Sequence, residues 1–335
     1  MKVSVVIPTY NRLNYLGKCL KSLSKQSVGS KSFEVIVVDD GSTDGTAHYL
    51  KKINRKNFTF LRQSNKGPAA ARNLGVRHAK GNIIAFIDDD CVARRDWIQN
   101  IITNFEKYKD ADSVACHTIP IYKKYFKNLE KFEKRNLIKN FKVIRFSGLE
   151  PDHRASTDNC ALKREIFMRL KGFNIAFKYA GEDPDFWYRL LKSGYNIYHV
   201  DNIIVYHYQR MSIKKMIKRS YLFGFADTIN YKDHFRKHLY IDLRSVLNFK
   251  FFSDFPITIA IAGNMFVKLI TLCLLILLIY PLLAILMLII IFIIMWIKSR
   301  SLVTVFEFYF REIIVQFPML VGKIIGSIKN RIIYI

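Results

Sequence analysis

Three consecutive aspartates, Asp88, Asp89 and Asp90, directly follow the apolar run NIIAFI in a chain of formal net charge +26. Adjacent carboxylates repel one another unless a positive group lies among them. Asp88 and Asp90 are two residues apart and so would lie on one side of a strand. Their hard oxygens suit Mg²⁺ or Mn²⁺, which combine few protein ligands with substrate phosphates. The alternative is that the acidic run only caps a following helix, expected to begin near Arg94, through the helix dipole.

The segments around these aspartates alternate between strand and helix patterns. Short β-branched runs predict strands that are buried on both faces. The predicted strands cover residues 3–8, 33–40, 58–63 and 82–88, and the predicted helices cover residues 15–23, 43–53 and 68–79. We expect Ser42 or Thr43 to cap the second helix and Pro68 to stand in the first turn of the third. This order predicts an α/β fold with a mainly parallel sheet. Ligands bind at the carboxyl ends of such strands, where PTYN, DDGSTD and DDD lie.

The pattern changes after Ser113. Between Tyr122 and Arg145 there are nine Lys or Arg and only two Glu, interleaved with aromatic residues. This composition predicts either a solvated helix face or a basic amphipathic helix on a membrane surface. Farther on, we expect a strand that leads into a helix at residues 155–173, a loop at 178–186, a helix from Trp187, and one or two strands at 195–208.

The C-terminal part has a different composition. No charged residue occurs between Leu269 and Ile297, and such a run reaches bilayer length. A hairpin that turns near Tyr280 and Pro281 would keep the basic residues on both sides of it in the cytoplasm. The last stretch predicts an interfacial amphipathic helix that is broken at Pro318.

The bulk composition narrows the class of partner. The positive excess suggests an anionic partner, and the apolar tail makes acidic lipids the simplest one, so we expect no nucleic acid. The five cysteines are scattered, without a C-x-x-C pair, which fits a reducing cytoplasm better than a disulfide framework or a zinc site. The N-terminal sequence KVSVVIP has no signal-peptide layout.

The motifs PTYNR, VVDDGSTDGT, NKGPAAARNLG, IAFIDDD and GEDPDFWYRL, in this order, resemble the family 2 glycosyltransferases over roughly residues 3 to 210. The resemblance implies a GT-A type, Rossmann-like fold with a mixed, mainly parallel sheet flanked by helices. We therefore expect a GT-A domain at residues 1–250, with a nucleotide-binding half at 1–112 and an acceptor half at 113–250. C-terminal membrane helices would follow at 256–335.

The resemblance also implies roles for the acidic residues. Asp90 would be the direct metal ligand, with Asp88 assisting and Asp89 facing the donor ribose. Asp40 would bind the donor base, while Asp39 supports the turn. Asp183 would be the base that deprotonates the acceptor hydroxyl, with inversion at the anomeric carbon. For Asp183 the alternatives are that Glu182 is the base, or that the GEDPD acids only cap a helix.

Other residues would complete the site by the same resemblance. Pro8, Thr9 and Tyr10 would contact the nucleotide through backbone and ring, with ordinary packing as the alternative for Tyr10. Arg72 would balance Asp40 or touch the nucleotide, unless it is merely exposed. His207 would approach the metal or the diphosphate, although a lone histidine is more often structural. Asn159 would help to shape the acceptor site.

The predicted function is that of an inverting, metal-dependent glycosyltransferase at the cytoplasmic face of the cell membrane. It would move a sugar from a UDP- or GDP-sugar to a hydroxyl of a lipid-linked or polysaccharide acceptor. The nearer rival is a polyprenyl-phosphate sugar synthase, whose anionic acceptor needs no deprotonation. A nucleotide-binding dehydrogenase would need a G-x-G-x-x-G turn after the first strand, and VVIPTYNRLN has none. A membrane-tethered nucleic-acid binder is suggested by the charge alone.

Overall fold

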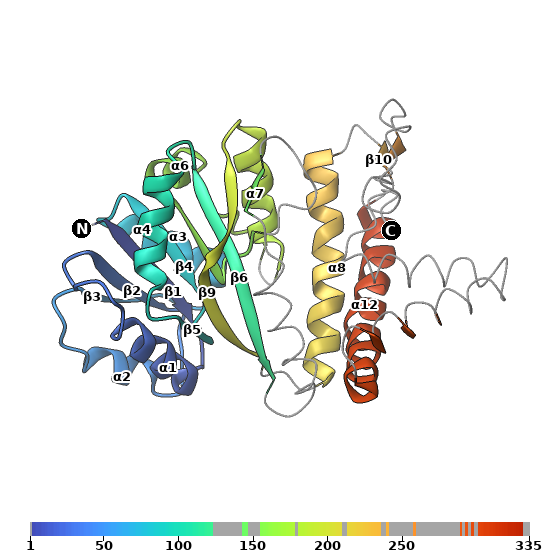
Figure 1. Cartoon of the computed structure of the whole chain (residues 1–335), viewed down its shortest axis with the longest axis horizontal. Helices are drawn as coiled ribbons and strands as arrows, with labels where there is room; N and C mark the ends of the chain where they lie inside the picture. Colours follow the sequence, from blue (N-terminus) through green and yellow to red (C-terminus); the bar gives the residue numbers. More distant parts are fainter. Residues whose placement is uncertain are drawn as a thin grey trace. The chain divides into compact units, whose positions relative to one another are not determined.

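The computed structural model describes a large part of the chain, which divides into two compact units (Figure 1). The first unit contains Met1–Ile121 and Lys134–Gln209, and the second contains Tyr122–Glu133 and Arg210–Ile335. The described residues are 2–122, 143–146, 155–177, 180–209, 213–235, 239–240, 257–258, 289, 292–293, 296–297 and 301–330.

The first four strands of the first unit are parallel, as the sequence predicts. They are β1 (Val3–Thr9), β2 (Phe33–Asp39), β3 (Phe58–Arg62) and β4 (Ile83–Ile87). β1 lies in the middle and pairs with β2 on one side and β4 on the other, while β3 pairs with β2. The carboxyl ends of β1, β2 and β4 therefore lie next to one another at the same edge of the sheet.

The remaining strands make the sheet mixed. Its order is β3-β2-β1-β4-β8-β6-β9-β5, with β7 paired to β9. These strands are β5 (Cys91–Ala93), β6 (Ser113–Tyr122), β7 (Ile144–Phe146), β8 (Asn159–Lys163) and β9 (Ile197–Gln209). β8 is antiparallel to β4, and β9 is antiparallel to β5. Because of this reversal, the amino end of β8 lies beside the carboxyl end of β4.

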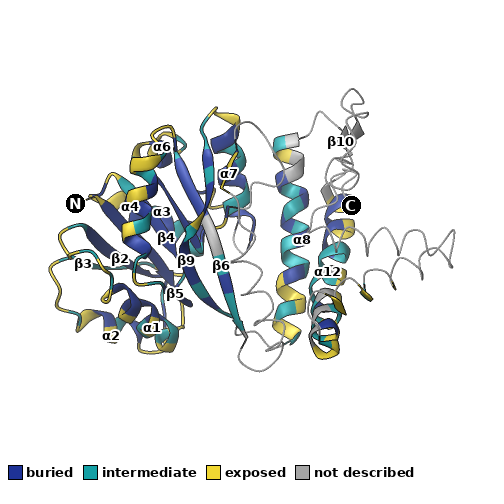
Figure 2. Cartoon of the chain, in the orientation of Figure 1, coloured by how far each residue is buried: buried dark blue, intermediate teal, exposed yellow. Residues whose placement is uncertain are grey.

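Strand residues alternate between two buried cores, one on each face of the sheet. On β1, Val3, Val5 and Ile7 belong to the core that contains residues of α1 (Leu13–Leu23), α2 (Thr46–Lys51) and α4 (Trp97–Lys107). Val6 belongs to the other core, with residues of α3 (Pro68–His78), α6 (Arg164–Arg169) and α7 (Glu182–Lys192). β1 and β2 are buried on both faces, as predicted, whereas β3 is only partly buried (Figure 2).

Three helix starts differ from the sequence prediction. α2 begins at Thr46 and not near Thr43, because Ser42 and Thr43 are hydrogen-bonded to Asn11 instead of capping a helix. After the three aspartates comes the short strand β5, and α4 begins at Trp97, not near Arg94. The predicted loop at 178–186 is shorter, because α7 begins at Glu182 and includes the GEDPD acids in its first turn.

The predicted basic helix between Tyr122 and Arg145 falls mostly outside the described residues. Its two described ends are strands: Tyr122 closes β6, and Arg145 belongs to β7, which pairs with β9. The prediction of a helix is therefore wrong for these ends. Cross-strand pairing with β9 supplies backbone hydrogen bonds that a local helical pattern cannot reveal.

The second unit contains two long helices that pack on each other, α8 (Ile213–Phe235) and α12 (Leu302–Asn330). A Cβ on Gly224 would lie 2.0 Å from Met319 O, and a Cβ on Gly322 would lie 2.1 Å from Tyr221 O. These glycines allow the two backbones to approach closely. α12 runs through Pro318, so the predicted break there is wrong; a helix can continue past a proline at the loss of one backbone hydrogen bond.

The predicted membrane hairpin around Tyr280 and Pro281 lies outside the described residues, apart from a few isolated positions. Within the part that the structure describes, we find no helix that is both long enough and apolar enough to cross a membrane. The second unit also contains a short parallel pair, β10 (Leu239–Tyr240) and β11 (Ile257–Thr258).

Two helix glycines of the first unit test the packing of helices on the sheet. A Cβ at Gly75 in α3 would lie 2.5 Å from Val6 Cγ1, whereas at Gly17 in α1 the nearest atom is Tyr49 Oη at 3.9 Å. Both Gly→Ala changes raise helix propensity equally, so their difference reports packing. We expect Gly75→Ala to be less stable than Gly17→Ala by about 1–3 kcal/mol. Urea denaturation of both variants measures this, and equal stabilities would contradict the tight α3–β1 contact.

Candidate active site

The three aspartates lie in the turn that follows β4 and point to three different partners. β4 ends at Ile87, and the Cys91 amide donates to the Asp88 carbonyl to close the turn. Asp88 contacts Arg72, Asp89 contacts Thr9, and Asp90 contacts His207. The expectation that Asp88 and Asp90 share one side of a strand is wrong, because strand alternation ends before Asp88.

Arg72 bridges Asp88, in the turn after β4, and Glu182, at the start of α7. Its Nη2 lies 2.8 Å from Asp88 Oδ1, and its Nη1 lies 2.9 Å from Glu182 Oε1. Arg72 is 4% exposed, so the alternative of a merely exposed arginine is wrong. Burial lowers the pKa of this guanidinium, but the charges of Asp88 and Glu182 outweigh burial and raise it. Arg72 therefore balances these two acids and not Asp40.

Asp89 is held inside the protein. It is 1% exposed, and its two oxygens accept hydrogen bonds from Thr9 Oγ1 at 2.7 Å and from Arg12 Nη1 at 2.9 Å. Burial raises the pKa of Asp89 to about 6, against the opposing charge of Arg12. The carboxylate thus faces β1 and the start of α1, which differs from the expectation that it faces the donor ribose.

His207 lies between two carboxylates. Its Nε2 is 3.2 Å from Asp90 Oδ1, and its Nδ1 is 3.5 Å from Asp158 Oδ2. Burial lowers the pKa of His207, but its contacts with Asp158 and Asp90 outweigh burial and raise it to about 10. The antiparallel register that sets His207 opposite Cys91 brings this late strand to the aspartate turn.

Potential metal ligands gather at Asp90, Cys91 and His207, whose ligand atoms lie within 4.8 Å of one another. Burial raises the pKa of the Cys91 thiol well above its ordinary value, so it is a poor ligand for a hard cation. The Asp90 carboxylate suits Mn²⁺ or Mg²⁺ that is completed by substrate phosphates, and the His207 imidazole can join it once its second proton has been displaced. Asp88, the other expected ligand, is not in this cluster and is paired with Arg72.

Asp40 holds the loop that leads into α3. Its carboxylate accepts hydrogen bonds from Gln63 Nε2 at 2.7 Å, from the Lys66 amide at 2.8 Å and from the Gly67 amide at 2.9 Å. These three donors occupy three of the about four acceptor positions that a carboxylate offers. Asp39 accepts from the Ser42 amide at 2.9 Å, and so supports the turn as expected.

The segment after β1 presents one exposed aromatic ring. Pro8 and Thr9 are buried in β1, whereas Tyr10 is 44% exposed, which does not fit ordinary packing. Asn11 next to it has a positive φ of 52° and links the two loops, because its amide donates to Ser42 Oγ and its Oδ1 accepts from the Thr43 amide. The loops after β1 and β2 therefore hold each other in place.

Asp183 lies in the first turn of α7, directly after Glu182. Its carboxyl is half-buried, and burial together with the neighbouring Glu182 charge raises its pKa to about 7. A carboxylate with such a pKa can accept a proton near neutral pH. Asp185 forms an ion pair with Arg189 at 2.8 Å on the next turn, so this acid is structural.

This edge of the sheet carries more negative than positive charge. Two arginines and one histidine contact or face six carboxylates, namely Asp88, Asp89, Asp90, Asp158, Glu182 and Asp183. The raised pKa values of Asp89 and Asp183 follow from burial combined with this crowding. A divalent cation would reduce the imbalance.

Sequence reasoning missed two site residues and misplaced one. Arg12 stands in the PTYNR motif, directly after β1. Because the parallel strands end at the same edge of the sheet, its charge could have been placed near the DDD motif. Asp158 directly precedes β8, and only the antiparallel pairing of Asn159 with Ile87 brings it to the aspartates. Asn159 itself is 1% exposed; it accepts from Trp97 Nε1 and donates to the Ile203 carbonyl, so it is a packing residue and not part of an acceptor site.

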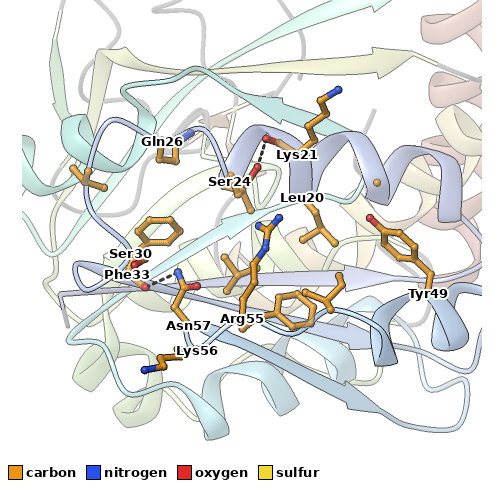
Figure 3. A pocket seen from close by; sticks show the side chains of 16 residues that line it. Leu20, Lys21, Ser24, Gln26, Ser30, Phe33, Tyr49, Arg55, Lys56 and Asn57 are labelled. Carbon is orange, nitrogen blue, oxygen red and sulfur yellow. Dashed lines mark hydrogen bonds between the residues drawn. The ribbon is translucent and has the colours of Figure 1, made fainter.

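A separate cavity of about 890 Å³ lies between α1, α2 and the amino ends of β2 and β3 (Figure 3). Phe33 and Phe58, the first residues of β2 and β3, line it, and the cationic side chains of Lys21, Arg55 and Lys56 contribute to its wall. None of the site residues described above lines it. This cavity is therefore distinct from the carboxylate-rich edge.

The profile of glycosyl transferase family 2 matches residues 4–171, which is half of the chain. The chain belongs to this family. The resemblance that the motifs suggested is thereby confirmed, and with it, at the level of the family, the prediction of a glycosyltransferase enzyme. Membrane association does not follow from this match.

Individual relatives match parts of the chain. An uncharacterized glycosyltransferase of Rickettsia conorii is 41% identical over 99 residues, which cover 29% of this chain and 16% of that protein. The dolichyl N-acetyl-alpha-D-glucosaminyl phosphate 3-beta-D-2,3-diacetamido-2,3-dideoxy-beta-D-glucuronosyltransferase of Methanococcus voltae is 24% identical over 232 residues, covering 67% of this chain and 72% of that protein.

A solved structure confirms the fold. The mannosyltransferase PcManGT of Pyrobaculum calidifontis, solved in complex with GDP-Man and Mn²⁺, superimposes with a TM-score of 0.52 at 21% identity, over 70% of this chain and 68% of that chain. This likeness supports the GT-A type, mixed α/β sheet that the resemblance implied. The alignment with the Rickettsia relative spans only 16% of that relative's length.

Replacing Arg72 tests the charge balance at the site. In Arg72→Met, Asp88 and Glu182 lose their shared partner in a buried setting, and breaking such a pair costs about 3–5 kcal/mol. The matched control is Lys2→Met, whose ion pair with Glu106 is exposed and should matter little. Urea denaturation measures both. An Arg72→Met chain as stable as the control would show that the bridge does not stabilise the fold.

Proposed function

We propose that this chain transfers a sugar from a nucleotide-sugar donor to an acceptor hydroxyl by an inverting, metal-dependent reaction. The observation that carries the proposal is the carboxylate-rich edge of the sheet, where Asp90 and His207 can hold a cation and Asp183 can act as a base. Family membership supports glycosyl transfer, and the geometry of these side chains supports the proposed roles.

Asp90 and His207 are the proposed metal ligands. A divalent Mg²⁺ or Mn²⁺ ion held there would supply positive charge to the departing nucleoside diphosphate, whose charge grows during transfer. Asp88 contributes only indirectly to the proposed metal site, because Arg72 already balances the charge of its carboxylate. Arg12 contacts both Asp89 and Asp90 and so fixes the turn that presents the metal ligand.

The donor nucleotide is proposed to bind across the loops after β1 and β2. Asp40 has an acceptor position left for the base, and the exposed ring of Tyr10 can stack on it. The Mn²⁺ complex of the PcManGT mannosyltransferase contains GDP-Man, and UDP is the other donor nucleotide that we consider. The acceptor half of the site is proposed to lie around Asp183.

Asp183 is the proposed base. A carboxylate at this position would take the proton from the acceptor hydroxyl as its oxygen attacks the anomeric carbon, and attack on the face opposite the leaving group inverts that centre. Glu182, the alternative base, is engaged by Arg72 at 2.9 Å and is therefore less free to accept a proton. The name of the Methanococcus relative describes transfer to a lipid-linked sugar, which favours a lipid-linked glycan as the acceptor here.

Changing Asp183 separates this proposal from a polyprenyl-phosphate sugar synthase. Loss of a general base reduces kcat by about 10²–10⁴, so we expect Asp183→Asn to lose transfer while the donor Kd is unchanged. In the wild type, the pKa of about 7 for Asp183 predicts that kcat reaches a plateau above neutral pH. Below neutral pH, kcat falls about tenfold per pH unit as Asp183 is protonated. Initial rates against pH, with Mn²⁺ present, measure both.

Asp201→Asn is the matched control for Asp183→Asn, because Asp201 is an exposed aspartate on β9. Asp201→Asn should retain the wild-type profile of kcat against pH. EDTA should abolish transfer in both the wild type and Asp201→Asn. An Asp183→Asn enzyme that keeps its rate would instead favour an acceptor that is already anionic.

We further propose that the second unit attaches the enzyme to the cytoplasmic face of the cell membrane. Apolar residues at helical spacing form one exposed stripe on α12, consisting of Phe306, Phe310, Ile313, Phe317 and Ile324. Phe306 is 71% exposed, while Gly322 and Gly326 on the opposite side of α12 face α8. An apolar stripe on a basic chain suits the interface of a bilayer with acidic lipids.

Polar substitutions in the stripe test membrane attachment. The triple change Phe306→Ser, Ile313→Ser and Phe317→Ser removes apolar area that would enter the headgroup region, at about 25 cal/mol per Å². We expect binding to vesicles of phosphatidylcholine and phosphatidylglycerol, measured by flotation, to fall sharply. The control is Ile175→Ser in the first unit, an isoleucine that is 62% exposed. Equal loss in the control, or no loss in the triple variant, would refute the role of the stripe.

A further inference from the structure

The imidazole of His207 is held at both ring nitrogens by acids from different strands. Nε2 lies 3.2 Å from Asp90 Oδ1, and Nδ1 lies 3.5 Å from Asp158 Oδ2. The first acid follows β4, and the second precedes β8. His207 thus has one nitrogen directed at the proposed metal ligand Asp90 and the other directed away from it.

The location of the imidazole proton decides whether His207 can bind a cation. A neutral imidazole carries its proton on one nitrogen only, and the other nitrogen has the lone pair that a metal needs. With the proton on Nε2, an N–H group would point at the cation position beside Asp90. With the proton on Nδ1, the Nε2 lone pair is available, and Asp158 accepts the hydrogen bond.

Asp158 is held in place by its strand and by its neighbours. In the antiparallel pairing of β8 with β4, Asn159 lies opposite Ile87, so Asp158 lies next to the start of the aspartate turn. The buried side chain of Asn159 donates to the carbonyl of Ile203 on β9, the strand that carries His207. One buried amide therefore fixes the acid and the histidine relative to each other.

Asp158 is placed to accept the Nδ1–H of His207, and it does not belong to the metal cluster. Among the described residues, the group whose ligand atoms lie close enough to share a cation contains Asp90, Cys91 and His207, and not Asp158.

We propose that Asp158 is a positioning residue that keeps the proton of His207 on Nδ1 and thereby directs the Nε2 lone pair toward a divalent cation shared with Asp90. This inference rests on the proposed function, because it presupposes the metal site. Asp158 acts through His207 and does not itself contact the cation. Such outer carboxylates typically contribute 10- to 100-fold, roughly, to metal affinity.

The experiment titrates the full-length protein with Mn²⁺ and follows two signals by electron paramagnetic resonance. The signal of unbound Mn²⁺ gives the affinity of the protein for the ion, and pulsed spectra show whether an imidazole nitrogen is bound to the ion. We expect Asp158→Ala to bind Mn²⁺ about 10- to 100-fold more weakly and to lose the nitrogen signal, as His207→Ala does. Asp158→Glu, which retains the acceptor, should recover part of both signals. Asp110→Ala is the control, because Asp110 is an exposed acid that pairs with Arg145.

The outcomes separate this inference from the proposed function. If wild type shows no bound nitrogen, both the metal assignment and the role of Asp158 are overturned. If wild type shows the nitrogen and Asp158→Ala keeps it with unchanged affinity, the metal site stands and the positioning role is overturned. Asp158→Leu, which fills the position without any hydrogen-bond acceptor, gives the same readout if Asp158→Ala does not fold; unchanged affinity and nitrogen signal in it would also overturn the inference.

Discussion

The site is organised by one electrostatic constraint, which is that several buried acids share one edge of a sheet. Like charges in a poorly solvated place are costly unless cations or hydrogen-bond donors face them. Arg72 faces Asp88 and Glu182, Arg12 faces Asp89 and Asp90, and His207 lies between Asp90 and Asp158. These three side chains come from α3, the start of α1 and the end of β9.

The switch from parallel to antiparallel strands allows this gathering. The parallel strands bring Thr9, Asp40 and the aspartate turn to one edge, as expected for an α/β sheet. β8 then runs in the opposite direction beside β4, so residues that precede it, such as Asp158, reach the same edge. β9 completes the arrangement because its pairing with β5 sets His207 beside the turn.

The first half of the fold was predictable from sequence because local signals and tertiary structure agree there. Each of β1 to β4 is a short run of apolar residues, and each motif residue follows its own strand in the chain. The second half was predictable only in part. β6 and β7 carry no clear alternating pattern, and the pairing of Ile144 with His199 joins residues far apart in sequence.

The individual contacts of the site depended on information that a motif does not contain. The sequence placed Arg72 near the acids, but its partners, Asp88 and Glu182, are separated by 94 positions and meet only because α3 and α7 pack on the same face. Asp158 stands in none of the five motifs that carry the family resemblance. The inward orientation of Asp89 follows from Thr9 and Arg12 and could not be read from the run of three aspartates.

The shared guanidinium of Arg72 also has an evolutionary consequence. Because one cation serves two acids from distant segments, losing the cation leaves two charges without a partner, and losing one acid alters the balance at the other. Positions 72, 88 and 182 should therefore change together among descendants of this chain, as a co-varying triplet. A change at one of these positions alone would destabilise the protein, so we expect the three residues to be inherited together.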